Sequence, residues 1–458
     1  MPGLFENLHF FLSFNRKTDY KNLFTDSYNQ IRFTQYIHNI YKGVHIMKKI
    51  FPFLFVLCLV LTSAPSLFAG GVDNKHNFSV EWVRTLNRNA ATDSADGVVY
   101  NPAGMMQMEN GLFLNLSSQY AIKDYSNTIG GVEYSSDTPS FIPSLFCLYK
   151  QDRWAAYAAF TIPSGGGKVE FDNGSATTLV LAQQFMAGAN AIIGLPLYDT
   201  INSQSLESEV IYYGYTIGGA YSLNKMVSVS LGLRFIDADK EANGSVSIGA
   251  SSGLAPDMAA KIDYKENADG WGGIIGLNIA PSDEVNIGIR YETKTDLDFK
   301  TTVNSDDLGA LANAGKARRD LPAILGIGIA YKIKPELNIE TDFTYYLNEK
   351  ANWNGAEDNV DNGYDLGFAI EYKFKPGLKG SIGYMYTDTG IDADYILPEA
   401  PQMGAHTVAA GLSCKLKPDL NFDMGILRAF YDTETTSTGM KLEKEVYILA
   451  FGIQYKFK

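Results

Sequence analysis

Large apolar side chains recur at every second residue over most of the chain. In the segments 444–458, 320–334 and 364–374, large aliphatic and aromatic residues alternate with small or polar ones. In the first of these segments the apolar set is Tyr447, Leu449, Phe451, Ile453, Tyr455 and Phe457. Because successive side chains on a β-strand point to opposite faces, each segment is predicted to be a strand with one apolar face.

The length of these segments and the position of their aromatic residues favour a membrane-spanning sheet over a soluble sandwich. Many segments run for about ten residues or more, which is what a tilted strand needs to cross a bilayer. Aromatic residues gather at both ends of the apolar faces: Tyr331, Tyr372, Phe374, Tyr455 and Phe457 at one end, and Tyr345, Tyr364, Tyr386 and Phe430 at the other. Two aromatic girdles around an aliphatic band are typical of transmembrane barrels, and a soluble sandwich gives no reason for both.

The connections between the predicted strands are alternately short and long. Short turns are expected at 151–152, 224–225, 281–283, 334–335, 375–377 and 417–418, and long loops near 123–140, 163–208, 241–268, 300–319, 348–361, 388–403 and 432–443. This pattern gives fourteen strands, an even number as in bacterial single-chain barrels, whose short turns face the periplasm. We therefore predict an all-β fold, a 14-stranded antiparallel transmembrane β-barrel over residues 110–458, with both termini periplasmic.

The region before the barrel is predicted to have three parts. Residues 47–69 combine a basic start, a short apolar run and small residues near Ala69, which is the build of a secretory signal peptide. Residues 1–46 are then an upstream extension outside the mature protein. Residues 70–109 lack the barrel's period of two, and place Trp82, Val83 and Leu86 at helical spacing. We expect this segment to form a small helical hatch that plugs the lumen.

Composition and charge narrow the functional classes. The net charge of −13 argues against a nucleic-acid binder. The Cys and His residues have no zinc spacing, so neither a metal site nor a cofactor is predicted. Ser164-Gly165-Gly166-Gly167-Lys168 is similar to a phosphate loop but lacks its first glycine. The chain is therefore not expected to be an enzyme, with an outer-membrane lipid hydrolase using His406 as base left as an alternative.

The hatch carries the one motif that points to a family. The run 84–93 and the following Asn101-Pro102-Ala103 resemble the N-terminal hatch of the outer-membrane FadL/TodX (OMPP1) family. The resemblance implies an outer-membrane transporter of long-chain fatty acids or aromatic hydrocarbons. It also implies a route in which the ligand is caught at an outer groove, passes to a lumen pocket, and leaves sideways where one strand of the wall is kinked, after the hatch shifts.

We favour passive uptake of long-chain fatty acids, with an aromatic hydrocarbon channel of the same family as the first alternative. A non-specific porin is an alternative of another class. The expected partners are a hydrophobic small molecule and the lipid and lipopolysaccharide of the Gram-negative outer membrane, and we expect a monomer.

The longest predicted loop supplies candidate ligand-binding residues. Its middle is unusually apolar, and Leu181, Phe185 and Ala189 have the spacing of a short amphipathic helix. The candidates for an entry groove are Leu179, Leu181, Phe185, Met186, Ile192, Ile193 and Leu195. Apolar ligand sites have such a lining, but the same segment could simply fold inward and cap the lumen.

A fatty acid also needs a partner for its carboxylate, and Arg offers bidentate binding. Arg234 and Arg290 fall on the lumen-facing phase of their strands, and Lys332 is a third candidate. The alternative is that these cations pair with acidic residues in the lumen, since charged groups inside proteins are usually paired. The acidic residues considered are Glu292, Glu340, Asp342 and Glu371.

Overall fold

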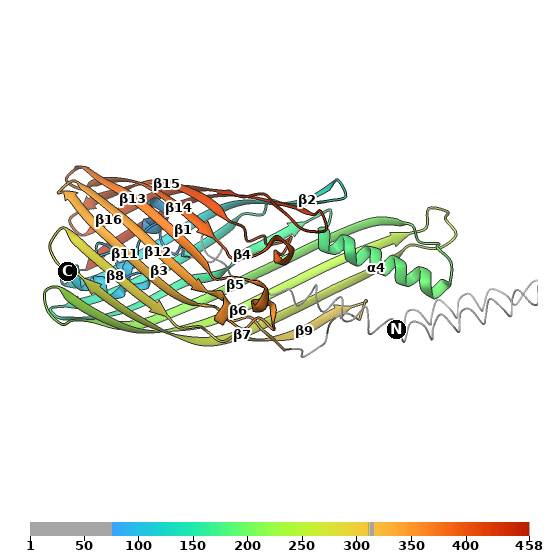
Figure 1. Ribbon diagram of the computed structural model, residues 1–458, viewed down its shortest axis with the longest axis horizontal. Helices are drawn as coiled ribbons and strands as arrows, with labels where there is room; N and C mark the ends of the chain where they lie inside the picture. Colours follow the sequence, from blue (N-terminus) through green and yellow to red (C-terminus); the bar gives the residue numbers. More distant parts are fainter. Residues whose placement is uncertain (1–75, 310, 312–315, 458) are drawn as a thin grey trace, which may run out of the picture.

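The chain forms one closed barrel with a small helical domain inside it (Figure 1). The computed structural model describes residues 76–309, 311 and 316–457. The predictions for 1–46 and for the signal peptide 47–69 therefore lie outside the described residues, as does the start of the predicted hatch.

Fourteen antiparallel strands form the wall of the barrel. They are β1 (Gly111–Ile129), β3 (Ser140–Gln151), β4 (Trp154–Phe171), β5 (Thr200–Ser222), β6 (Val227–Gly249), β7 (Met258–Ile279), β8 (Val285–Glu292), β11 (Ala323–Lys334), β12 (Leu337–Leu347), β13 (Gly363–Lys375), β14 (Leu378–Asp388), β15 (Ala405–Lys417), β16 (Leu420–Tyr431) and β18 (Lys441–Phe457). The barrel closes where β1 pairs with β18, from Leu112–Phe457 to Thr128–Lys441. The predicted fold class is confirmed.

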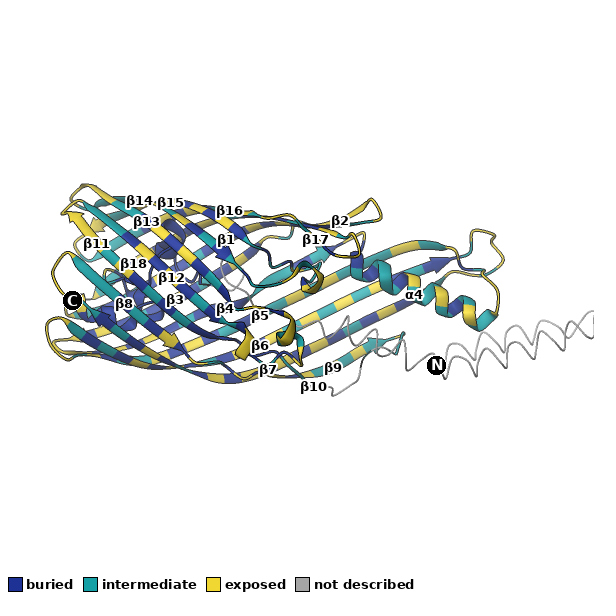
Figure 2. Cartoon of the chain, in the orientation of Figure 1, coloured by how far each residue is buried: buried dark blue, intermediate teal, exposed yellow. Residues whose placement is uncertain are grey.

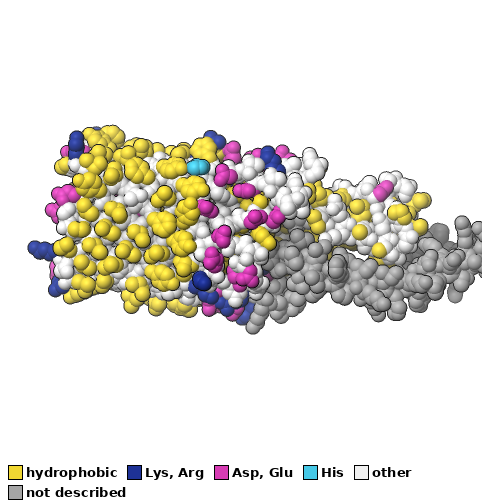
Figure 3. Space-filling view, viewed as in Figure 1, with side chains coloured by type: hydrophobic (Ala, Val, Ile, Leu, Met, Phe, Trp, Pro, Cys, Tyr) yellow, Lys and Arg dark blue, Asp and Glu magenta, His cyan; other side chains and the backbone are white. Residues whose placement is uncertain are grey.

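The outer face of the barrel is apolar over a broad band (Figure 3). Buried and exposed residues alternate along each strand (Figure 2), as the period of two requires. The exposed residues of the band include Leu231, Ile275, Phe368, Ile382 and Phe451. In a soluble protein a continuous apolar surface of this size would be unstable in water, so lipid is its natural solvent.

The short turns agree with the sequence analysis, but several predicted loops do not. The strands β5, β6 and β7 have 23, 23 and 22 residues and extend well beyond β11–β16, which have 11 to 13. The loops predicted at 163–208 and 241–268 are therefore mostly strand or helix. Both faces of these extensions carry polar residues because the strands have left the membrane, which removes the alternation on which the prediction relied.

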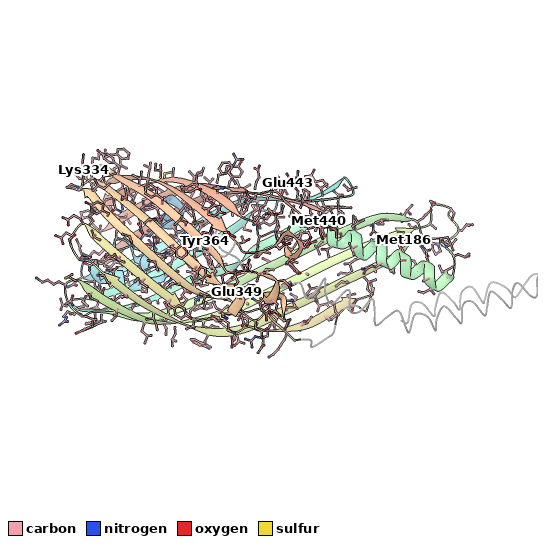
Figure 4. All side chains as sticks on the ribbon, viewed as in Figure 1. Met186, Lys334, Glu349, Tyr364, Met440 and Glu443 are labelled. Atoms are coloured by element: carbon pink, nitrogen blue, oxygen red, sulfur yellow. The ribbon has the colours of Figure 1, made fainter. Side chains whose placement is uncertain are left out.

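Short elements complete the loop end of the barrel. They are the strands β2 (Val132–Ser136), β9 (Asp298–Asp306), β10 (Lys316–Arg318) and β17 (Glu434–Thr435), and the 3-10 turns η4 (Asn348–Lys350), η5 (Ala356–Asn359) and η6 (Ala393–Tyr395). The helix α4 (Ala176–Ile193) lies along the protruding strands at this end (Figure 1). Lys334 and Met186, labelled in Figure 4, mark the short-turn end and the loop end of the molecule.

The lumen holds the hatch, as predicted. It consists of the helix α3 (Val80–Thr85) and two 3-10 turns, η2 (Ala95–Val99) and η3 (Pro102–Gln107). The helix α3 packs against β13–β16 and β18, whereas η3 contacts β5, β6 and β7 on the other side. The hatch therefore bridges the whole cross-section of the barrel.

Candidate ligand cavity and hatch

A cavity of about 200 Å³ lies at the loop end of the lumen, between α4 and the extended strands. Leu181 of α4, Val246 of β6 and Ile262 of β7 give it apolar walls. The residues of the loop before β15 that close it are Leu397, Glu399, Ala400 and Gln402. A mostly apolar cavity with a few polar groups is what a hydrophobic ligand with a polar head would require.

The helix α4 forms one wall of this cavity. Ser175 caps its N-terminus, because its side chain accepts a hydrogen bond from Thr178 N while the Thr178 hydroxyl accepts one from Ser175 N. Gly194, with φ 73°, ends it. The helix is long and apolar enough to cross a bilayer, but it packs on β5 and β6 instead. A helix is therefore present where the spacing of Leu181, Phe185 and Ala189 predicts one, but it is longer than expected and apolar on most of its surface.

The candidate groove residues of α4 divide into separate groups. Only Leu181 lines the cavity. Leu179 packs on the main core. Phe185, Met186 and Ile193 pack on small apolar clusters that contain residues such as Ile248 of β6 and Ala260 of β7. Ile192 is half-buried, and Leu195 is exposed at the tip. Most of these residues thus pack against the barrel, in agreement with the alternative that the segment folds inward and caps the lumen. Leu181 is the one that faces the cavity.

A kink in β4 forms another wall of the cavity. The pairing of β4 with β5 shifts register twice, between Thr161 and Ser164 and between Ser164 and Gly167. Gly165 and Gly167 have φ of 89° and 74°, values that L side chains rarely adopt. The segment Ser164-Gly165-Gly166-Gly167-Lys168, predicted as the start of a loop, is therefore a kinked part of the barrel wall.

The kink coincides with a break in the ladder between β3 and β4. These two strands pair only from Leu145–Phe160 to Gln151–Trp154, although β3 begins at Ser140. Beyond the break, side chains take over the hydrogen bonding: Lys123 Nζ donates to Gly166 O at 2.6 Å, and Ser140 Oγ donates to the same oxygen. Side-chain contacts thus replace ladder bonds at one place in the wall, directly beside the cavity.

The hatch is fixed by its predicted motif. Asn101 Oδ1 accepts a hydrogen bond from Gly104 N at 3.2 Å, so Asn101 caps η3, and Pro102 occupies its first turn. Asn101 Nδ2 also donates to Asn278 Oδ1 of β7 at 2.7 Å, and Ala103 O accepts from Ser228 Oγ of β6 at 2.7 Å. The motif therefore begins η3, the last element of the hatch, and joins the hatch to the wall.

Acidic residues of the wall hold the other half of the hatch. Arg84 Nε lies 3.2 Å from Asp423 Oδ1 of β16, and its Nη1 pairs with Glu371 of β13. Asp342 Oδ2 of β12 accepts from the backbone N atoms of Arg88 and Asn89, both at 2.7 Å. Asp342 and Glu371, two of the predicted lumen acids, therefore bind the hatch, which the sequence did not indicate.

A belt of inward-facing glycines lets the hatch lie close to the wall. A Cβ added at any of these positions would meet a hatch atom: Gly288, Gly326, Gly328, Gly367, Gly383, Gly411, Gly425 and Gly452. At Gly383, for example, it would overlap Thr85 O, and at Gly411 the Cβ of Arg84. These glycines were visible in the sequence as the small residues on the inner phase of the strands.

The three predicted carboxylate ligands do not lie together. Arg234 Nη2 is 2.7 Å from Glu292 Oε2, and Arg290 Nε is 3.1 Å from Glu292 Oε1. Arg290 also donates to Val99 O of the hatch. Both arginines are buried and pair with an acidic residue of the lumen, which was the alternative to carboxylate binding. Lys332 is exposed at the short-turn end, where its Nζ donates to Asp283 O at 3.1 Å. Its predicted lumen-facing position is wrong because the strand has already left the lumen there.

The cations that line the cavity are two lysines that the sequence analysis did not single out. Lys240 of β6 has its Nζ 3.3 Å from Glu266 Oε2. Lys444 of β18 donates to Pro401 O at 2.9 Å and lies over the rings of Tyr125 and Tyr431. Lys240 could have been found because it shares the inner phase of β6 with Arg234, six residues earlier.

The comparisons with known proteins settle the family. Residues 61–457 match the model of a family described as outer membrane protein transport protein (OMPP1/FadL/TodX). The chain belongs to the OMPP1/FadL/TodX family. It is therefore an outer-membrane transport protein and not an enzyme, so the hydrolase alternative based on His406 is set aside. His406 lies on the outer face, with its Nδ1 2.7 Å from Tyr384 Oη.

Solved structures of OMPP1/FadL/TodX proteins share the fold at low sequence identity. A Pseudomonas aeruginosa FadL homologue is 15% identical, with a TM-score of 0.61 over 86% of this chain and 100% of the other. The Pseudomonas putida toluene transporter TodX is 17% identical, with a TM-score of 0.60 over 80% and 96%. The Ralstonia pickettii toluene transporter TbuX is 17% identical, with a TM-score of 0.59 over 86% and 100%. A search of curated proteins finds no match.

Proposed function

We propose that this member of the family takes up long-chain fatty acids by passive transport, with the hatch closing the lumen to small polar solutes. The observation that carries the proposal is the apolar cavity with Lys240 and Lys444 in its lining. Its walls suit an acyl chain, and an ammonium group in a partly dehydrated site attracts a carboxylate. The loop end would face outward, with the short turns and the C-terminus in the periplasm.

The proposed route begins at α4 and ends at the break in the wall. A ligand would enter between α4 and the loop 397–402, occupy the cavity, and leave sideways between β3 and β4. The kink at Gly165–Gly167 supports this exit because it lies between the cavity and the missing part of the ladder. The hatch contacts both strands of this exit through η2, so the ligand would leave past that part of the hatch.

The alternative cargo is an aromatic hydrocarbon. It is favoured by the similarity to TodX and TbuX, which are toluene transporters. A hydrocarbon has no carboxylate, so the two cargoes differ in their need for the cavity lysines.

The experiment is uptake of oleate and of toluene by cells that produce the wild type or the double variant Lys240→Gln/Lys444→Gln. We expect oleate uptake to fall about tenfold or more in the double variant, since each lost charge-assisted contact contributes about 1.5–3 kcal/mol, with toluene unaffected. The matched control is Lys225→Gln/Lys334→Gln, which removes two exposed lysines at the short-turn end. Unchanged oleate uptake in the cavity variant would contradict the carboxylate role of the lysines.

A further inference from the structure

The break between β3 and β4 follows from two prolines. The ladder stops at the pair Leu145–Phe160, and Pro143 of β3 and Pro163 of β4 lie just beyond it toward the loop end. Proline has no backbone N–H, so neither residue can donate a ladder bond. Beside the break, Phe141 of β3 has an exposed fraction of 65% on the outer face, as expected of a side chain in lipid. The break therefore has lipid on one side and the cavity on the other.

A lysine of a third strand closes this break from the lumen side. Lys123 is buried on the inner phase of β1, and its Nζ donates to Gly166 O at 2.6 Å and to Lys168 O at 3.0 Å. Because β3 lies between β1 and β4 in the wall, Lys123 joins two strands that are not neighbours. Gly165 and Gly167 give the bonded segment of β4 more backbone freedom than other residues would. The contacts of Lys123 therefore hold a part of the wall that could otherwise move.

The same lysine lies close to the proposed carboxylate site. Tyr125, two residues further along β1, lines the cavity, and so does Gly166, whose carbonyl group Lys123 binds. The Nζ atoms of Lys123 and Lys444 lie 5.7 Å and 4.8 Å from the centre of the Tyr125 ring. A carboxylate bound at Lys444 would therefore have to pass only this ring to meet Lys123.

We propose that Lys123 is a positioning residue that couples recognition of the cargo's carboxylate to opening of the wall. A bond from an ammonium group to a carboxylate is stronger than one to a carbonyl group, because both partners are charged. The carboxylate would draw Lys123 Nζ away from Gly166 O and Lys168 O, which releases β4 from β1 and widens the break toward lipid. An uncharged chain of the same length offers no such exchange. The inference rests on the proposed function and adds a selection for acids at the exit.

The experiment measures amide hydrogen exchange over residues 161–170, with the protein in nanodiscs alone, with oleate and with oleyl alcohol. Exchange in this segment reports how often the break opens. We expect oleate to accelerate it about tenfold, the effect of losing one hydrogen bond from a charged group. Oleyl alcohol, which has the same chain without the carboxylate, should leave it unchanged. Lys123→Gln should exchange faster than the wild type without ligand and should not respond to oleate.

A matched variant separates the charge of Lys123 from its structural contacts. Ser140→Ala removes the other side-chain bond to Gly166 O but keeps the lysine. It should also exchange faster without ligand, yet still respond to oleate. Lys225→Gln, at an exposed lysine of the short-turn end, should change neither property. If Lys123→Gln responds to oleate as the wild type does, or if the wild type responds equally to oleyl alcohol, the proposed coupling is wrong.

Binding is measured separately, by native mass spectrometry that counts the oleate retained by the same samples. The wild type should retain oleate, and Lys240→Gln/Lys444→Gln should retain less. Retained oleate without faster exchange over residues 161–170 would overturn the coupling and leave the proposed function intact. Retention that does not depend on the two cavity lysines would instead contradict the carboxylate site, and the coupling with it.

Discussion

Arg84 of the hatch and Asp423 of β16 form an ion pair between the hatch and the barrel wall, with Arg84 Nε 3.2 Å from Asp423 Oδ1 and both side chains buried. The pair joins residues 339 positions apart, and Glu371 completes the contacts of the guanidinium group. A buried cation without its partner is strongly unfavourable. This ion pair should therefore help to hold the hatch in the lumen.

Asp423→Asn should loosen the hatch by about 1.5–3 kcal/mol, the contribution of one hydrogen bond between charged groups, because Arg84 keeps Glu371 as a partner. Amide hydrogen exchange over residues 80–90 should accelerate, and single-channel recordings should show brief openings to small ions. The matched control is Glu445→Gln, which removes an exposed partner of Arg428 at 3.6 Å. Unchanged exchange in Asp423→Asn would show that the hatch does not depend on this pair.

Gly383→Val should displace α3 from the wall. Any Cβ at this position overlaps Thr85 O, and a backbone atom cannot move aside as a side chain can. We expect exchange over residues 80–87 to rise while the barrel itself stays folded. Gly273→Val is the control, because the nearest atom to its added Cβ is Thr293 Cγ2 at 3.5 Å. Equal exchange in the two variants would contradict the close approach of hatch and wall.

Glu81 should make the seating of the hatch depend on pH. Burial, and then the nearby carboxylates of Asp96 and Asp423, raise the pKa of Glu81 to about 8. The folded state therefore holds this proton between about pH 4.5 and 8, whereas the unfolded state releases it, and the stability contribution is lost as the pH rises through that window. Hydrogen exchange over 80–90 should accelerate from pH 5 to pH 8 beyond the intrinsic rate. Glu81→Gln should remove this pH dependence of the exchange rate. If the rate still rises with pH in the variant, another titratable group is responsible.

Asn101→Ala should weaken the other end of the hatch. It removes the cap of η3 and the hydrogen bonds to Ala91 O and Asn278 Oδ1, which together contribute about 2–4 kcal/mol. Limited proteolysis or exchange over residues 95–108 measures the change. Asn304→Ala, which loses an exposed contact to Asp263, is the matched control. If residues 95–108 were equally protected from proteolysis and exchange in both variants, the proposed role of Asn101 in holding the hatch would be contradicted.

The barrel could be predicted from the sequence because lipid imposes a strict alternation on each strand, as in 364–374 and 444–458. Where strands leave the membrane this constraint ends, so the alternation does not predict the outer parts of β5, β6 and β7 as strands. The hatch was predicted from Asn101-Pro102-Ala103 and from the helical spacing of Trp82 and Leu86.

The site was harder to predict because a strand's phase gives the direction of a side chain but not its partner. Arg234 and Arg290 were correctly placed toward the lumen, yet their contact with Glu292 depends on the register between strands. Lys444 lines the cavity only because the loop 397–402 folds over it, and no local pattern indicates such a closure.

The most direct test of the account is uptake into cells lacking other fatty-acid transporters. Cells that produce the protein should accumulate labelled oleate well above cells with an empty vector, and should gain no permeability to arabinose, because the hatch closes the lumen to polar solutes. Arabinose flux with no gain in oleate uptake would mean that the protein is a general pore, and would contradict the proposed function.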